Sequence, residues 1–127
     1  MPRKKTGIFK SKWEATIASE LKACKIPLQY EVDRLEYIVP ESNHTYRPDF
    51  KLPSGHYIEA KGIFDKQDRE KILLVKEQHP GIKIFLAFQN AKQKIYKRSK
   101  TTYADWCTKN GVEWSHQGIK KEWLKIT

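Results

Sequence analysis

The chain has 127 residues, with 25 Lys or Arg and 15 Asp or Glu, which gives a formal net charge of +10. This length suits one domain over residues 1–127, and no apolar run approaches the roughly 20 residues that a membrane-spanning helix requires. The basic excess favours nucleic acid as the partner, because Lys and Arg gain affinity by releasing counterions from phosphate. Charge alone separates neither DNA from RNA nor cutting from binding.

The N-terminus and the cysteines narrow the class of protein further. Residues 1–8 indicate a basic arm with Arg3, Lys4 and Lys5, and no apolar segment follows as in a secretory signal. Cys24 and Cys107 are far apart in the sequence and predict reduced thiols rather than a zinc site. We therefore expect a cytoplasmic protein that makes no membrane contact.

Helical and strand patterns alternate along the chain and predict an α/β fold. Ser11 can cap a helix to about Lys25, and residues 28–39 favour one or two strands before a turn or linker at 40–43. Two strands, 44–52 and 56–61, follow as a hairpin around residues 53–55. The remaining expected elements are a helix at 65–79, an apolar strand at 83–88, a helix at 102–110, a strand at 112–115 and a short helix at 120–124. This order predicts a mixed β-sheet flanked by helices.

A hairpin register centred on Ser54 separates its side chains into two faces. Phe50 then pairs with Ile58, and Asp49 pairs with Glu59. The apolar face contains Phe50, Leu52, Ile58 and Ala60. The polar face contains Arg47, Asp49, Lys51, Tyr57, Glu59 and Lys61.

Asp49, Glu59 and Lys61 on the polar face are candidate catalytic residues. Paired carboxylates about 5 Å apart repel unless a cation neutralises them, and Mg²⁺ is held by carboxylates together with water and substrate phosphate. Lys61 can orient or deprotonate a water on the same face. The other interpretation is a solvated ladder of salt bridges, with each pair contributing about 0.2–1 kcal/mol. The preceding proline and the basic chain favour the catalytic interpretation.

Glu14 is a further candidate, because it shares the apolar stripe of the first helix with Ile17, Ala18 and Leu21. An acid on a buried stripe is costly unless it is paired or bound to metal. A glutamate at the rim that reaches solvent is the alternative. Glu20 competes for the same role but is less well aligned.

The pattern Pro48-Asp49, Glu59-Ala60-Lys61 is the signature of the PD-(D/E)xK nuclease superfamily. A closer resemblance extends over residues 37–50, 52–55, 59–62, 69–71, 77–80 and 94–97. Together these segments resemble the phage endonuclease I type of Holliday junction resolvase, over roughly residues 7–126. The resemblance implies a restriction-endonuclease-like fold and a structure-selective endonuclease that cuts four-way and other branched DNA by paired nicks.

The same resemblance implies a divalent-metal site and assigns its residues. Mg²⁺, with Mn²⁺ as a substitute and two ions per site, would be bound by Asp49, Glu59, Glu14 and the Ala60 carbonyl. Lys61 would assist the attacking water. If the chain is phage-encoded, the host cytoplasm is its expected location.

The resemblance also implies an intertwined homodimer, in which a β bridge at about residues 36–40 joins swapped halves. Each site would then combine Glu14 of one chain with Asp49, Glu59 and Lys61 of the other. The candidate DNA-binding residues are Arg3, Lys4, Lys5, Arg47 and Lys51.

Two other functions remain open at this point. One is a sequence-specific or nicking endonuclease of the same fold. The other is a DNA-binding module without catalysis, which the carboxylate pair disfavours because it would repel DNA unless a metal is bound.

Overall fold

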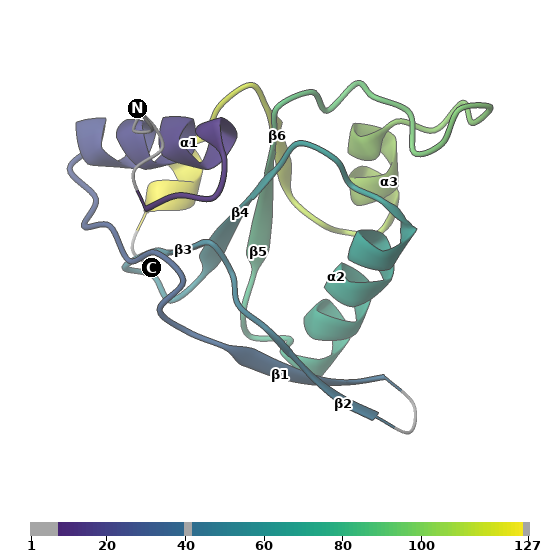
Figure 1. The fold of residues 1–127 in the computed structure, drawn as a ribbon, viewed down its shortest axis with the longest axis horizontal. Helices are drawn as coiled ribbons and strands as arrows, with labels where there is room; N and C mark the ends of the chain where they lie inside the picture. Colours follow the sequence, from purple (N-terminus) through teal and green to yellow (C-terminus); the bar gives the residue numbers. More distant parts are fainter. Residues whose placement is uncertain (1–7, 40–41, 126–127) are drawn as a thin grey trace.

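The computed structural model describes residues 8–39 and 42–125. Its elements follow one another as shown in Figure 1. They are α1 (Lys12–Ala23), β1 (Leu35–Val39), β2 (Ser42–Tyr46), β3 (Phe50–Lys51), β4 (Tyr57–Lys61), α2 (Lys66–Gln78), β5 (Ile84–Phe88), α3 (Tyr103–Lys109), β6 (Trp114–His116) and a 3-10 helix η1 (Lys121–Leu124). The expected α/β class is confirmed, and Ser11 caps α1 as predicted, through a hydrogen bond from the Glu14 N–H to the Ser11 Oγ.

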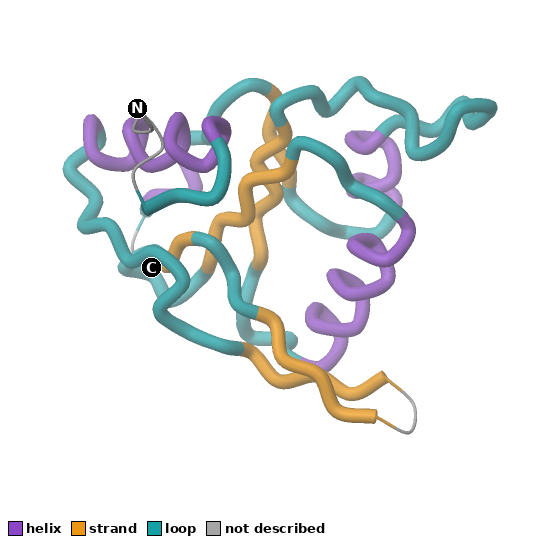
Figure 2. Tube along the Cα trace, in the orientation of Figure 1, coloured by secondary structure: helices purple, strands orange, loops and turns teal. Residues whose placement is uncertain are grey.

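The main sheet has the strand order β3-β4-β5-β6 and is mixed, as expected. Strands β4, β5 and β6 run parallel, whereas β3 is antiparallel to β4. Helices cover both of its faces, as the tube in Figure 2 shows. No helix within the described ranges is long and apolar enough to cross a membrane.

Two apolar clusters hold the helices to the two faces of the sheet. On one face, α1 and η1 pack on β3, β4 and β5 through residues that include Ile17, Leu21, Ile58 and Trp123. On the other, α2 and α3 pack on β5 through a second cluster that includes Phe64. All five residues of β5 are buried, which confirms the strand predicted from its continuous apolar run.

A second, two-stranded sheet corrects the predicted hairpin. Residues 44–52 were expected to form one strand, but β2 pairs with β1, and only Phe50–Lys51 of β3 pairs with β4. The chain leaves the ladder at Pro48, which has no N–H to donate to a neighbouring strand. Residues 42–43, expected in a turn, belong to β2.

The predicted register is correct where the ladder exists. Phe50 lies opposite Ile58 and Lys51 lies opposite Tyr57, and the Leu52 N–H donates to the His56 carbonyl at 2.8 Å. The face expected to be polar is covered rather than open: Asp49 and Glu59 are buried, and Tyr57 lies in the cluster that contains Phe64. The second apolar layer, formed by α2 and α3, covers that face of the sheet.

The β1–β2 hairpin is fastened to the end of α2 by side chains that bind its backbone. Gln78 accepts a hydrogen bond from the Ile38 N–H at 2.7 Å and donates to the Ile38 carbonyl at 2.9 Å. The His79 Nε2 lies 2.6 Å from the Glu36 carbonyl. These contacts give hydrogen-bond partners to backbone groups on the free edge of β1. β1 contains residues 36–39 of the expected bridge, and Pro40 lies outside the described residues.

Phe64 and its neighbour Ile63 provide a matched test of the core. Phe64 is fully buried and makes edge-to-face contacts with Phe88, Tyr103 and Trp106, whereas Ile63 is 70% exposed. We expect Phe64→Ala to lower the free energy of unfolding by about 3–5 kcal/mol. Ile63→Ala should change it by no more than about 0.5 kcal/mol. Urea denaturation measures both, and equal effects would contradict the assigned core.

Candidate active site

Asp49 lies where the chain leaves the main sheet, and its carboxylate takes the place of a strand partner. Asp49 is buried, and its Oδ2 accepts a hydrogen bond from the Ala60 N–H at 2.9 Å. Its carbonyl accepts a second one from the Glu31 N–H at 2.8 Å. The two contacts anchor Asp49 between the end of β4 and the irregular segment that contains Glu31.

The position of Ala60 explains how its carbonyl can serve as a ligand. Tyr57 and Lys61 use their backbone groups to bind the β5 side of the sheet, so the N–H and C=O of Ala60 point toward the β3 side. Continuing the β3–β4 register would bring Pro48 opposite Ala60, but proline has no N–H to donate to that carbonyl. The Ala60 carbonyl therefore points toward Asp49, and residue 48 offers it no hydrogen bond.

Glu59 is buried and held by two donors. Its Oε1 accepts hydrogen bonds from the Tyr46 hydroxyl at 2.7 Å and from the Asp49 N–H at 3.2 Å. The Lys61 Nζ lies 3.8 Å from the Glu59 Oε2 and 3.1 Å from the Asp68 Oδ1 at the start of α2. Asp49, Glu59 and Lys61 thus lie together as expected, but the buried carboxylates do not form a solvated ladder.

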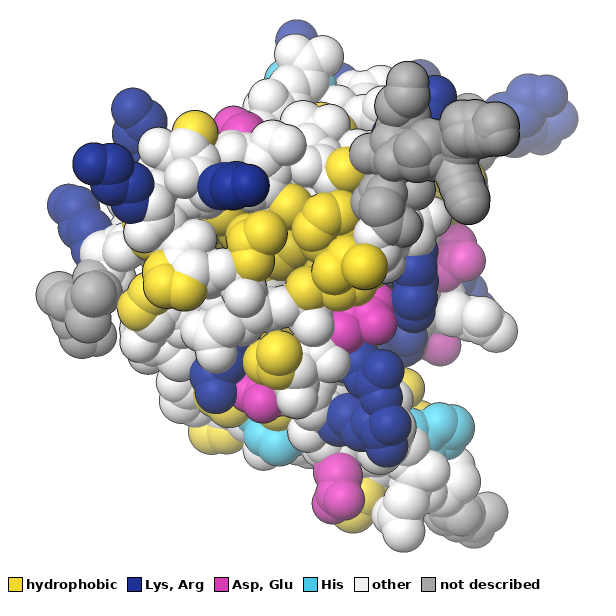
Figure 3. All heavy atoms as spheres, turned by 60° about the vertical axis from the view of Figure 1, so that its left-hand side comes forward, with side chains coloured by type: hydrophobic (Ala, Val, Ile, Leu, Met, Phe, Trp, Pro, Cys, Tyr) yellow, Lys and Arg dark blue, Asp and Glu magenta, His cyan; other side chains and the backbone are white. Residues whose placement is uncertain are grey.

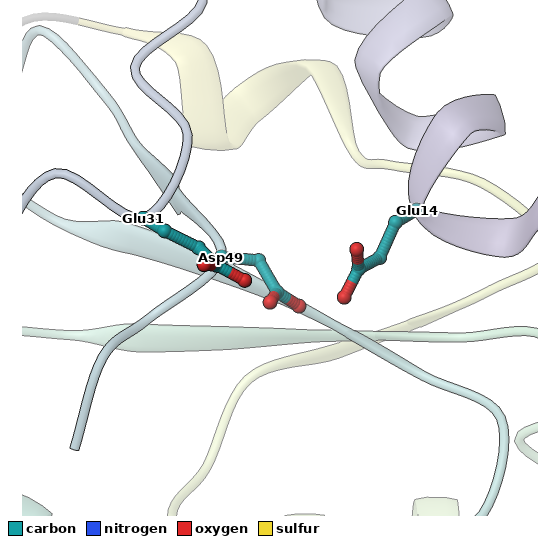
Figure 4. Close-up of side chains that lie close together, drawn as sticks. All are labelled: Glu14, Glu31 and Asp49. Atoms are coloured by element: carbon teal, nitrogen blue, oxygen red, sulfur yellow. The ribbon is translucent and has the colours of Figure 1, made fainter. Parts of the chain in front are cut away.

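Glu14 reaches the same place from α1. It is buried, and its Oε1 accepts hydrogen bonds from the Tyr30 hydroxyl at 2.6 Å and from the Lys10 N–H at 2.9 Å. Figure 4 shows the Glu14 and Asp49 carboxylates pointing toward one another. Within one chain, therefore, the fold brings Glu14 to Asp49.

Glu31 is an acidic residue of this site that no pattern in the sequence indicates. Oxygens of Glu14, Glu31 and Asp49 lie within 4.8 Å of one another, with Glu31 on the other side of Asp49 from Glu14 (Figure 4). Glu31 lies in an irregular segment with a φ of +53°, so no periodic pattern marks it. Glu59 is not part of this set of three; it contacts Asp49 through the backbone N–H.

Burial and mutual repulsion raise the pKa values of the two central carboxyl groups. Burial, followed by the negative charge of Glu59, raises the pKa of Asp49 to about 9, against the hydrogen bond from Ala60. Burial also raises the pKa of Glu59, although Lys61 and the Tyr46 hydroxyl act in the opposite direction. The folded, metal-free site thus disfavours negative charge on Asp49, because its own cations do not offset burial and the charge of Glu59.

The oxygen ligands at this site fit a hard divalent cation. Magnesium and calcium ions prefer carboxylate and carbonyl oxygens, and this site offers three converging carboxylates. A bound cation would also relieve the repulsion that raises the pKa of Asp49. The acidic centre therefore has the chemistry of a metal site.

The other predicted residues lie outside this centre or contact its rim. Arg47 is within 3.8 Å of Glu31, and Lys51 pairs with Asp33 at 2.8 Å. Glu20, the alternative to Glu14, instead approaches Gly118. Arg3, Lys4 and Lys5 lie outside the described residues. Figure 3 shows Lys and Arg side chains distributed around this side of the molecule, with acidic side chains among them.

Comparisons with known proteins identify the class as a DNA endonuclease. The chain is 40% identical over 122 residues to "Endonuclease I" of Escherichia phage T7, a match that covers 96% of this chain and 82% of that protein. It is 45% identical over 104 residues to "Endodeoxyribonuclease 1" of Enterobacteria phage T3, covering 82% and 68% of the two chains. The family model for phage endonuclease I matches residues 2–127. The chain belongs to the phage endonuclease I family.

The raised pKa of Asp49 predicts a pH dependence of stability. Below about pH 9 the folded, metal-free protein retains a proton on Asp49 that the unfolded chain, with a pKa near 3.8, releases. Folding then binds a proton, so stability falls as the pH rises toward 9. We expect the Tm measured in EDTA to decrease from about pH 6 to about pH 9 and Mg²⁺ to raise it most at high pH.

The control for this measurement is Asp49→Asn, which removes the titrating group and keeps the side-chain size. Its Tm should depend less steeply on pH over the same range. The same slope in Asp49→Asn and the unsubstituted chain would show that Asp49 does not carry the effect.

Proposed function

We propose that this protein is a Mg²⁺-dependent, structure-selective endonuclease that resolves four-way and other branched DNA junctions by paired nicks. The observation that carries the proposal is the convergence of Glu14, Asp49 and Glu59 beside Lys61 at one end of β4. Family membership supplies the endonuclease activity. Mn²⁺ would substitute for Mg²⁺, with two ions per site, in the cytoplasm of the host cell.

Each side chain has a defined part in the proposed hydrolysis of a DNA phosphodiester. Bound Mg²⁺ would supply Lewis acidity and an activated water. Asp49, Glu59, Glu14 and the Ala60 carbonyl would hold it, with Glu59 oriented by Tyr46 and the Asp49 N–H. The Lys61 side chain is only 17% exposed. It orients the water or offsets negative charge on the phosphate. The products carry 5′-phosphate and 3′-hydroxyl ends.

Removing Lys61 or Asp49 should abolish cleavage and leave junction binding largely intact. For Lys61→Ala or Asp49→Ala we expect the cleavage rate of a synthetic four-way junction in Mg²⁺ to fall at least ~100-fold, about 2.7 kcal/mol of transition-state stabilisation. EDTA should abolish cleavage by the unsubstituted chain. Binding is measured separately by gel retardation in EDTA.

Asp33→Ala is a matched acidic control, because Asp33 pairs with Lys51 and Tyr57 rather than with the acidic centre. It should cut at close to the normal rate. A Lys61→Ala or Asp49→Ala protein that cuts equally well would refute the assigned site. Equal cleavage of linear duplex and junction would instead favour the sequence-specific or nicking alternative, and no cleavage of any branched DNA would favour the non-catalytic module.

The proposed enzyme acts as an intertwined homodimer with swapped N-terminal halves. Residues 36–39 of the expected bridge lie in β1, which pairs with β2. A swap across this bridge would let the N-terminal helix occupy the same position on a second chain, because a swap preserves the contacts and changes only which chain makes them. Two linked sites then account for paired nicks.

Mixing two inactive homodimers tests the swap. Glu14→Ala and Lys61→Ala dimers are combined under conditions of chain exchange. In a swapped mixed dimer one site carries both defects and the other carries neither, so nicking of a single strand should recover. Without a swap every site carries one defect, and the absence of recovery after verified exchange would contradict it.

A further inference from the structure

We propose that residues 92–100, called here the basic loop, bind the phosphate backbone of a duplex DNA arm next to the cleavage site. The proposal rests on the proposed function, since the ligand is an arm of the same DNA. The loop contains no acidic residue, and its cations are Lys92, Lys94, Lys97, Arg98 and Lys100.

The cations of the basic loop are free to contact phosphate. All five are exposed, and none forms an ion pair with a residue in the described ranges. By contrast, Lys10, Arg47, Lys51 and Lys61 near the acidic centre are all paired with carboxylates. Tyr96, at 62% exposed, adds an apolar surface between these charges that can pack on sugars. The loop therefore offers charges that need not break an existing ion pair in order to bind DNA.

The basic loop has a defined conformation before any ligand binds. The Ser99 N–H donates to the Tyr96 carbonyl at 3.0 Å and closes a turn, and the Ile95 N–H donates to the Thr101 carbonyl at 2.9 Å. The buried Ser99 hydroxyl accepts the Thr101 N–H at 2.9 Å. A preformed loop loses less conformational entropy on binding than a flexible one.

The loop begins a few residues after β5 leaves the end of the sheet that carries the acidic centre, and one hydrogen bond joins it to α2. The Gln89 N–H, where the chain leaves β5, donates to the Lys61 carbonyl at 3.0 Å. The Arg69 guanidinium donates to the Ile95 carbonyl at 3.5 Å, and its neighbour Asp68 pairs with Lys61 at 3.1 Å. Figure 1 shows the segment between β5 and α3 leaving this end of the sheet and extending past α3.

This geometry limits which part of the DNA the loop contacts. Arg98 lies nine residues after Gln89, and an extended chain of that length spans at most about 30 Å. At 3.4 Å per base pair along one strand, the phosphates lie within about nine base pairs of the cut. The loop thus holds the arm that leaves the cleavage site and acts through the backbone, without reading sequence.

The test compares two variants that each remove two positive charges. Lys97→Ala/Arg98→Ala changes the basic loop. Lys76→Ala/Lys109→Ala changes exposed cations in α2 and α3, near the opposite end of the sheet. Affinity for a four-way junction with long arms is measured in EDTA at several salt concentrations, after circular dichroism has verified folding. Lys97→Gln/Arg98→Gln, which keeps long side chains, provides a second loop variant.

We expect the loop variants to reduce the slope of log affinity against log salt by about 1.8, because each lost phosphate contact contributes about 0.9. Affinity should fall about tenfold or more at 0.1 M salt, while the control variant stays close to the unsubstituted chain. Equal slopes and affinities in the loop and control variants would overturn the proposal. Binding is measured without divalent metal, so it does not depend on cleavage. Failure of the chain to cut branched DNA would refute the proposed function but would not change the outcome of this binding test.

Discussion

The hydrogen bond from the Ala60 N–H to the Asp49 carboxylate is the contact on which the acidic centre depends. It forms because the β3–β4 ladder ends before Ala60 has a partner on β3, so the Ala60 N–H donates to the Asp49 carboxylate in place of a strand carbonyl. A backbone donor at the end of β4 is then satisfied by a side chain, and that side chain is Asp49. A longer hairpin would have placed the carboxylate in the regular side-chain alternation of a strand, where it could not bind the backbone beside it.

The break in the ladder also sets which elements surround Asp49. Because Asp49 lies at the edge of the sheet, α1 can bring Glu14 from one face while β4 brings Glu59 from the other. Tyr30 and Tyr46 each donate a hydroxyl hydrogen bond to one of these glutamates. The buried acids are thus oriented by neutral donors, which hold their geometry without cancelling the negative charge that a divalent cation requires.

Most of this site could be predicted from the sequence, and the exceptions have physical reasons. The register of the β3–β4 hairpin and the burial of Glu14 both follow from periodic patterns, because such patterns indicate which side of an element each residue occupies. Glu31 has no such pattern, since it lies in an irregular segment at positive φ. Tyr57 was misplaced because hairpin alternation does not reveal that α2 and α3 cover the second face. The β1–β2 pairing was missed because the strand pattern of residues 44–52 is continuous across the break.

The distribution of charge couples DNA binding to the acidic centre. A net charge of +10 attracts a polyanion, yet the cations nearest the acidic centre are already paired with carboxylates. Phosphate approaching the centre meets repulsion from buried acids, whereas the five cations of the basic loop, which form no ion pair in the described ranges, lie farther along the same end of the sheet. In the proposed enzyme, attraction by the basic loop would hold the duplex over the site, and repulsion at the centre would make the final approach of the phosphate depend on a divalent cation.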